Sequence, residues 1–141
     1  MVGTKLVDEI KLKIEAGAEA ADPDDILQLF ELMKQITEEV DYLKKDTIEE
    51  KMIGQVNLSD VDKSYWFKAS EGLIEYGEGK IDDPLFLITT TKDIGLGLFL
   101  GEVDANIVSP LGKLKIGGNY KTLRAFQEFY EDSIEEFKKR Y

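Results

Sequence analysis

The chain of 141 residues contains no cysteine and no histidine. These absences exclude thiol nucleophiles, disulfide bonds, Cys/His zinc sites and catalytic triads built on histidine. Only carboxylates, lysine, tyrosine, serine and threonine remain as catalytic groups, and no motif arranges them for a reaction. We therefore expect a protein that is not an enzyme, with no catalytic residues, no metal site and no cofactor.

A long hydrophobic run is also absent. No segment approaches the roughly 20 apolar residues that a membrane-spanning helix needs. The N-terminal stretch Met1 to Lys5 is soon followed by Asp8 and Glu9, so it lacks the apolar core of a signal peptide. The last three residues, Lys139-Arg140-Tyr141, do not form a peroxisomal signal. We expect a cytoplasmic protein with no stable membrane insertion.

Positive charge is scarce relative to negative charge. The chain carries 29 acidic and 18 basic residues, for a formal net charge of -11. Such a surface repels phosphate backbones, so nucleic acid is not an expected partner. The same repulsion disfavours unaided adsorption to anionic lipid headgroups.

The length and the hydrophobic content bound the architecture. A chain of 141 residues with 43% hydrophobic residues is long enough for one domain with a hydrophobic core and too short for two domains of typical size. We expect a single domain over residues 1–141. It divides into a helical N-terminal part, residues 1–50, and a core part, residues 51–141.

Two helices are predicted in the N-terminal part. The first covers residues 4–16, and the second starts at Asp22-Pro23-Asp24-Asp25 and runs to about Lys45. The acidic start lacks the glycine and distal glutamate of a calcium loop, so we interpret it as a helix cap. Apolar residues from Ile26 to Leu43 alternate three and four apart. This stripe is under three heptads long, which favours packing on the protein's own sheet over a coiled-coil seam.

From Met52 onward, the apolar pattern changes toward a period of two. Short connections predict antiparallel neighbours. The predicted strands are residues 53–58, 65–69, 72–76, 85–90 and 112–116, and the predicted helices are residues 92–100, a short turn within 103–109, and 121–140. The fold class is therefore α+β, with an antiparallel sheet of about five strands and covering helices.

Gly95 and Gly97 lie inside the apolar helix predicted over residues 92–100. Two glycines in a helix cost roughly 1 kcal/mol each relative to alanine. They leave room either for a tightly packed neighbour or for a ligand, and the sequence does not choose between these two explanations.

The order of elements from Asp83 to Asn119 resembles the sterol-carrier-protein domain, the SCP-2-like family. The resemblance rests on the strand from Leu85, the apolar helix from Lys92, the Gly101-x-x-Asp104 linker and the Gly112-Lys113-Leu114-Lys115 strand before the last helix. It covers about residues 50–140. It implies a curved antiparallel sheet covered by helices around an internal hydrophobic tunnel, in which the family holds fatty acids, acyl chains or sterols.

A tunnel of this kind needs apolar walls on two facing elements. The helix around Phe99 and the helix around Leu123 and Phe126 offer one wall, and three strand residues offer the other. Each buried methylene of a ligand contributes about 0.8 kcal/mol, so a long acyl chain needs little polar recognition. The expected ligand-binding residues are Trp66, Ile74, Leu87, Phe99, Leu123 and Phe126.

Two functions of different classes follow from the sequence. The first is non-enzymatic binding, and also transfer or presentation, of a fatty-acyl or sterol-like lipid. The alternative is a dimerisation or interaction module, or an accessory subunit of an acyl-handling enzyme, whose cavity is filled by its own side chains. The stripe from Ile26 to Leu43 motivates the alternative, in which the partner is a second copy of the chain or an enzyme.

Overall fold

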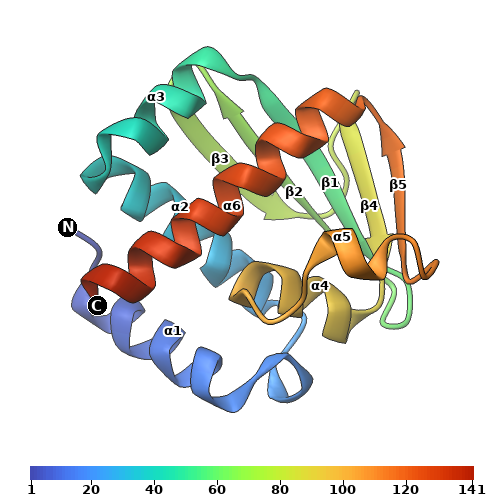
Figure 1. The fold of residues 1–141 in the computed structure, drawn as a ribbon, viewed down its shortest axis with the longest axis horizontal. Helices are drawn as coiled ribbons and strands as arrows, with labels where there is room; N and C mark the ends of the chain where they lie inside the picture. Colours follow the sequence, from blue (N-terminus) through green and yellow to red (C-terminus); the bar gives the residue numbers. More distant parts are fainter.

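A five-stranded sheet forms one layer of the molecule, and helices cover one of its two faces (Figure 1). The structure, a computed structural model, describes residues 1–141. The strand order is β3-β2-β1-β4-β5. The strands are β1 (Met52–Leu58), β2 (Lys63–Ser70), β3 (Leu73–Glu78), β4 (Phe86–Thr90) and β5 (Leu114–Gly118).

The helices come from both ends of the chain. Three of them precede the sheet, and α6 follows it and crosses its face (Figure 1). The helical segments are α1 (Thr4–Ala16), the short 3-10 turn η1 (Ala18–Ala20), α2 (Asp25–Glu39), α3 (Asp41–Glu49), α4 (Lys92–Leu100), α5 (Ala105–Val108) and α6 (Tyr120–Arg140). None of them combines the length and hydrophobicity of a transmembrane span.

The structure confirms the α+β fold class, with one correction to the sheet. Three strand pairs are antiparallel, as predicted, but β1 and β4 are parallel, so the sheet is mixed. Residues 79–85 carry the chain from the edge strand β3 back across the sheet to β1 without a helix. Two hydrogen bonds hold this crossing, from the Ile81 amide to Gln55 Oε1 at 3.1 Å and from the Leu85 amide to the Ile53 carbonyl at 2.7 Å.

Alternation along the strands separates an interior face, which the helices cover, from an outer face. In β2, for example, Tyr65, Phe67 and Ala69 are buried beneath the helices, whereas Trp66 and Lys68 point to the outer face. At the parallel pair, the ring of Phe86 occupies the space beside Gly54. A Cβ atom at position 54 would lie 2.0 Å from that ring, so only glycine fits there.

The prediction of one helix from Asp22 to about Lys45 is wrong, because the chain breaks at Val40. Val40 is buried and has extended backbone angles, φ -117° and ψ 109°. The break turns α3 toward α6, β2 and β3, where Leu43 and Thr47 are buried. The stripe on α2 is buried within the chain's own core, so it is not available as a coiled-coil seam.

The segment of α1 and η1 is held against α4. Lys92 Nζ donates to the carbonyls of Glu19 and Ala21, both at 2.9 Å, and the Ala18 amide donates to Glu102 Oε2 at 3.0 Å. Ile10 of α1 is completely buried in the core. The first helix therefore contributes to the same core as the sheet.

We expect Ile10→Ala to lower the free energy of unfolding by about 2–5 kcal/mol, because it leaves a cavity among buried side chains. Leu12→Ala on the same helix is the matched control, since Leu12 is 65% exposed whereas Ile10 is 0% exposed. Urea denaturation of both variants measures the difference. Equal small losses in the two variants would show that α1 does not belong to the cooperative core.

Candidate functional site between the sheet and the helices

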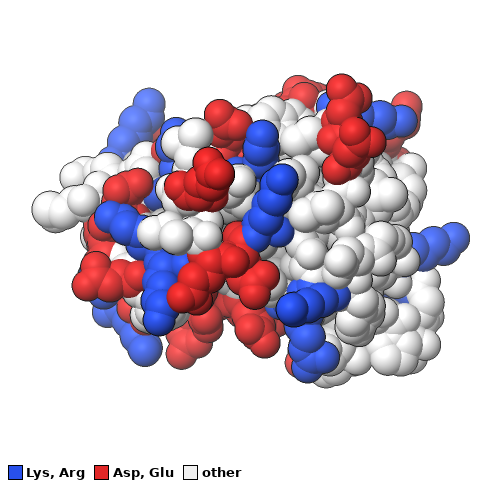
Figure 2. Space-filling view, turned by 90° about the horizontal axis from the view of Figure 1, so that it is seen from above, with Lys and Arg blue, Asp and Glu red and all other residues white.

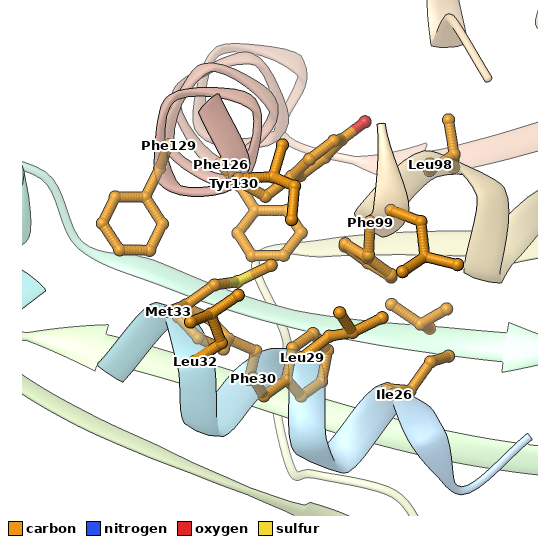
Figure 3. Close-up of a cluster of buried hydrophobic side chains, with 14 of the residues drawn as sticks. Ile26, Leu29, Phe30, Leu32, Met33, Leu98, Phe99, Phe126, Phe129 and Tyr130 are labelled. Carbon is orange, nitrogen blue, oxygen red and sulfur yellow. The ribbon is translucent and has the colours of Figure 1, made fainter. Parts of the chain in front are cut away.

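The space between the sheet and the helices is filled by aromatic side chains. Phe126 lies at the centre, with its ring centroid 5.1 Å from Phe67, 5.0 Å from Phe86 and 5.4 Å from Tyr130. Phe30 and Phe99 extend the cluster toward α2 and α4, with centroids 5.4 Å apart. Figure 3 shows these rings from α2, α4 and α6 pointing toward one another. Offset and edge-on pairs of this kind each add about 0.5–1.5 kcal/mol to simple burial.

The interior offers almost no chemistry apart from hydrophobic contact. No charged residue is buried, and the buried polar side chains form hydrogen bonds inside the protein. Thr37, Thr47 and Ser133, for example, donate to backbone carbonyls at 2.6–2.7 Å. No group of three or more acidic residues lies in a position to hold a metal ion. The interior is therefore suited to apolar ligands or to structural packing.

Four of the six residues expected to bind a ligand face the interior. Phe99, Leu123 and Phe126 lie on the helices, and Ile74 lies on β3, and all four are buried. Phe99 and Phe126 contact each other, with ring centroids 6.1 Å apart. Ile74 pairs with Ala69 near the far edge of the sheet. The structure thus brings Phe99, Leu123 and Phe126 to one region.

The expected placement of Trp66 and Leu87 on the tunnel wall is wrong, because both side chains point to the outer face. Each pairs with Gln55 of β1, one from either side, so all three residues share that face. The indole of Trp66 lies over Gly77, where an added Cβ would be 2.8 Å from Nε1. Leu87 is 36% exposed. These two residues are separated from Phe99 and Phe126 by the sheet.

The predicted tunnel is replaced by a shallow hollow at one end of the interior. This hollow has a volume of about 120 Å³ and lies between α5, β5 and α6. Ala105, Ile116, Tyr120 and Leu123 are its hydrophobic lining residues, and Arg124 is its one cationic residue. Leu123 lies one helical turn from Phe126 on α6, so its side chain separates the hollow from the aromatic cluster.

The segment over this hollow is weakly attached. We call residues 102–111, which include α5, the α5 strap. Ala105 is its one buried residue. Gly101 and Gly112 flank the strap with positive φ angles of 80° and 75°. No heavy atom lies within 4 Å of the position of a Cβ at Gly112. The strap therefore buries little side-chain surface, although the amides of Glu102 and Val103 donate hydrogen bonds to the carbonyl of Gly97 at 2.8 Å and 3.1 Å.

Tyr130 is a residue of this region that the sequence alone does not single out. Four other tyrosines donate hydrogen bonds to carboxylates, and Tyr120 is exposed. Tyr130 is buried but forms no hydrogen bond within the protein. Its hydroxyl points away from the cluster, on the side toward α4 (Figure 3). Burial, together with Glu131 and Asp104, raises the pKa of Tyr130, so the hydroxyl stays protonated and able to donate. In the sequence, the one feature that could have identified Tyr130 is that it is the only tyrosine between Phe126 and Ile134.

The glycines of α4 pack against the protein itself. A Cβ at Gly95 would lie 2.7 Å from Leu58, and one at Gly97 would lie 2.5 Å from Val103 of the α5 strap. Of the two explanations that the sequence left open, the structure supports tight packing. Gly97 also provides the surface on which the strap rests.

Like charges face each other where α3 packs on α6. Burial raises the pKa of Asp46 and of Asp132, and nearby carboxylates raise both values further. Glu128 contributes to both shifts, and Asp46 contributes to that of Asp132. At neutral pH these carboxylates are ionised in the folded and unfolded states, so their repulsion weakens the folded state.

We expect Asp132→Asn to raise the free energy of unfolding at pH 7 by roughly 0.2–0.5 kcal/mol, the size of a like-charge contact between exposed groups. Because the folded-state pKa is raised, the wild-type protein takes up the proton as pH falls, and the gain should vanish in acid. Asp82→Asn, in an exposed loop, is the control. Urea titrations at several pH values measure the gain, and a gain that grows in acid would contradict this account.

Comparison with known proteins identifies the fold. No family model matches the chain, and no curated protein matches it. Among solved structures, the sterol carrier protein domain 2 of Helicoverpa armigera matches with a TM-score of 0.60 and 15% identity, over 82% of this chain and 94% of that one. UbiJ-SCP2, a ubiquinone synthesis protein, matches with a TM-score of 0.57 and 14% identity, over 73% and 85% of the two chains.

A similar unit occurs within a much larger protein. The inverting sec-alkylsulfatase Pisa1 from Pseudomonas sp. matches with a TM-score of 0.53 and 16% identity over 62% of this chain, which spans 13% of the alkylsulfatase chain. Together, these similarities show that the chain has the sterol-carrier fold, in agreement with the resemblance found in its sequence.

Proposed function

We propose that the protein binds a long fatty-acyl or sterol-like lipid between the interior face of the sheet and helices α4 and α6. The observation that carries this proposal is an uncharged, aromatic interior in the sterol-carrier fold, next to a hollow from which only Leu123 separates it. Burial of methylenes supplies the affinity, so binding requires no catalytic group and no cofactor.

Binding requires the interior to expand. The hollow of about 120 Å³ is smaller than the 300–1,000 Å³ that ligand pockets usually provide. The α5 strap supplies the movement, because Ala105 is its one buried residue and Gly101 and Gly112 flank it with positive φ angles. The ligand tail replaces the packing around Leu123 and then reaches Phe126 and Phe99.

Two polar groups border the proposed path of the ligand. Arg124 lines the hollow at the protein surface, where a carboxylate headgroup of a fatty acid would remain in contact with water. The Tyr130 ring packs against Phe99 and Phe126, and its hydroxyl, which points away from these rings, is available to donate a hydrogen bond. Because Glu131 and Asp104 are near this hydroxyl, its partner would be a neutral acceptor, such as an ester carbonyl or a sterol hydroxyl.

The filled interior favours a second function, an interaction module or an accessory subunit of an acyl-handling enzyme. In that case, the aromatic cluster is purely structural and the α5 strap stays in place. The match to a short part of an alkylsulfatase supports this possibility, because there the fold is one unit of a larger protein. Ligand retention separates the two functions: native mass spectrometry of gently purified protein should detect a bound lipid only for the first.

We expect palmitate to raise the melting temperature of the delipidated protein and octanoate to raise it much less. A ligand that binds only the native state adds RT ln(1 + [L]/Kd), roughly 2.7 kcal/mol at a hundredfold excess over Kd. The shorter acid buries fewer methylenes, each contributing about 0.8 kcal/mol. Differential scanning fluorimetry at matched concentrations below micelle formation measures both shifts. Equal shifts, or no shift with either acid, would contradict lipid binding.

We expect Leu123→Trp to weaken palmitate binding by about tenfold or more, because the larger ring fills the hollow and closes the path to Phe126. The substitution adds no charge, so it leaves the interior apolar. Leu12→Trp is the control, because Leu12 is exposed on α1, a helix that contributes no residue to the hollow. Isothermal titration calorimetry gives both affinities. An unchanged Kd for a folded Leu123→Trp protein would remove the hollow from the path.

A further inference from the structure

One end of this acidic molecule is basic. Residues 105–127 contain four of the chain's 18 cationic residues and none of its 29 acidic residues. The four are Lys113, Lys115, Lys121 and Arg124. All four are exposed and none forms an ion pair. We call the surface of residues 105–124 the basic end.

The basic end lies at one edge of the fold. It combines α5, β5 and the start of α6, which lie together on the right in Figure 1. Figure 2 shows red and blue groups crowded over the left of the molecule, whereas the right-hand side is largely white with blue groups and with red groups mainly at its upper edge. The charges of the chain are therefore segregated in space as well as in sequence.

Three large apolar side chains are exposed among these cations. Ile107, Leu111 and Tyr120 are 62%, 64% and 65% exposed, respectively. Aliphatic side chains beside tyrosine and lysine are the combination found where proteins meet the lipid–water interface. A surface that contacts only water gains nothing from exposing these three apolar side chains together.

The cations at the start of α6 oppose the stability of that helix. The positive end of a helix dipole favours acidic residues, and α2, α3 and α4 carry Asp25, Asp41 and Asp93 in their first turns. The first turn of α6 has no acidic residue, and Lys121 lies in it. A helix start without an acid adds to the positive potential of the basic end instead of reducing it.

We propose that the basic end docks on the surface of an anionic lipid bilayer. The cations lie among the headgroups, and Ile107, Leu111 and Tyr120 enter the interfacial layer. The acidic remainder of the protein faces away, and physiological salt screens its repulsion beyond about 8 Å. The net charge of -11 predicts the opposite behaviour, but adsorption depends on the charges that meet the membrane. This inference goes beyond ligand binding in the interior, since the empty protein would dock as well.

The test is flotation of delipidated protein with vesicles of phosphatidylcholine alone or with about 30 mol% phosphatidylserine. We expect binding only to the anionic vesicles and loss of binding as salt increases. The triple variant Lys113→Gln, Lys115→Gln, Lys121→Gln should bind the anionic vesicles with an affinity at least about tenfold lower, because each cation near an anionic surface contributes to adsorption. Arg124 is kept because it lines the hollow.

The matched control is the triple variant Lys5→Gln, Lys34→Gln, Lys51→Gln, which makes the same change in net charge at exposed and unpaired positions outside the basic end. It should retain wild-type binding to the anionic vesicles. The apolar contribution is tested by Leu111→Ser against Leu12→Ser, two leucines of nearly equal exposure. Only Leu111→Ser should reduce binding.

Equal losses in the two triple variants would overturn the proposal, as would equal binding to neutral and anionic vesicles or the absence of binding to both. Absence of binding to both kinds of vesicle would indicate that the basic end binds an acidic protein instead. The dependence of binding on lipid composition and on salt is measured with the wild-type protein, so this part of the test does not require that the variants fold. Palmitate binding is measured without vesicles, so failure of membrane docking and failure of lipid binding are separate results.

Discussion

The packing of Phe126 against the sheet is the contact on which the rest of the structure depends. Its ring touches Phe67 of β2, Phe86 of β4, and Phe99 of α4, so one side chain of the last helix joins strands and a helix from distant parts of the chain. Phe86 reaches it only because position 54 is glycine. Loss of a phenylalanine at such a site costs about 3–5 kcal/mol, a large fraction of the stability of a domain this size.

The same packing sets the conditions for function. An interior without charged groups is poorly suited to acid–base chemistry, but it can accept an apolar chain if some of its own contacts are released. The contacts that cost least to release lie at the α5 strap, where few side chains are buried. The strap also belongs to the basic end, so opening of the interior and approach to a lipid surface would occur at the same place.

Much of this fold could be predicted from the sequence, because apolar periodicity and helix ends are local properties. The first helix and α4 have the predicted limits, 4–16 and 92–100. A period of two places Trp66 and Phe67 on opposite faces of the sheet, but it does not tell which face the helices cover. The sequence prediction therefore assigned Trp66 and Leu87 to the wrong face. The parallel pairing of β1 with β4 depends on a loop that crosses the sheet, and the break at Val40 depends on tertiary packing. Neither leaves a local signal.

The most direct test of the proposed site is a titration of methyl-labelled protein with palmitate, followed by NMR. Leucine and isoleucine methyl groups mark both faces of the sheet. The account predicts large shifts at Leu123 and Ile88 on the interior side, and small shifts at Leu87 and Ile53 on the outer face. Shifts confined to Leu87 and Ile53, or no shifts at all, would contradict binding between the sheet and the helices.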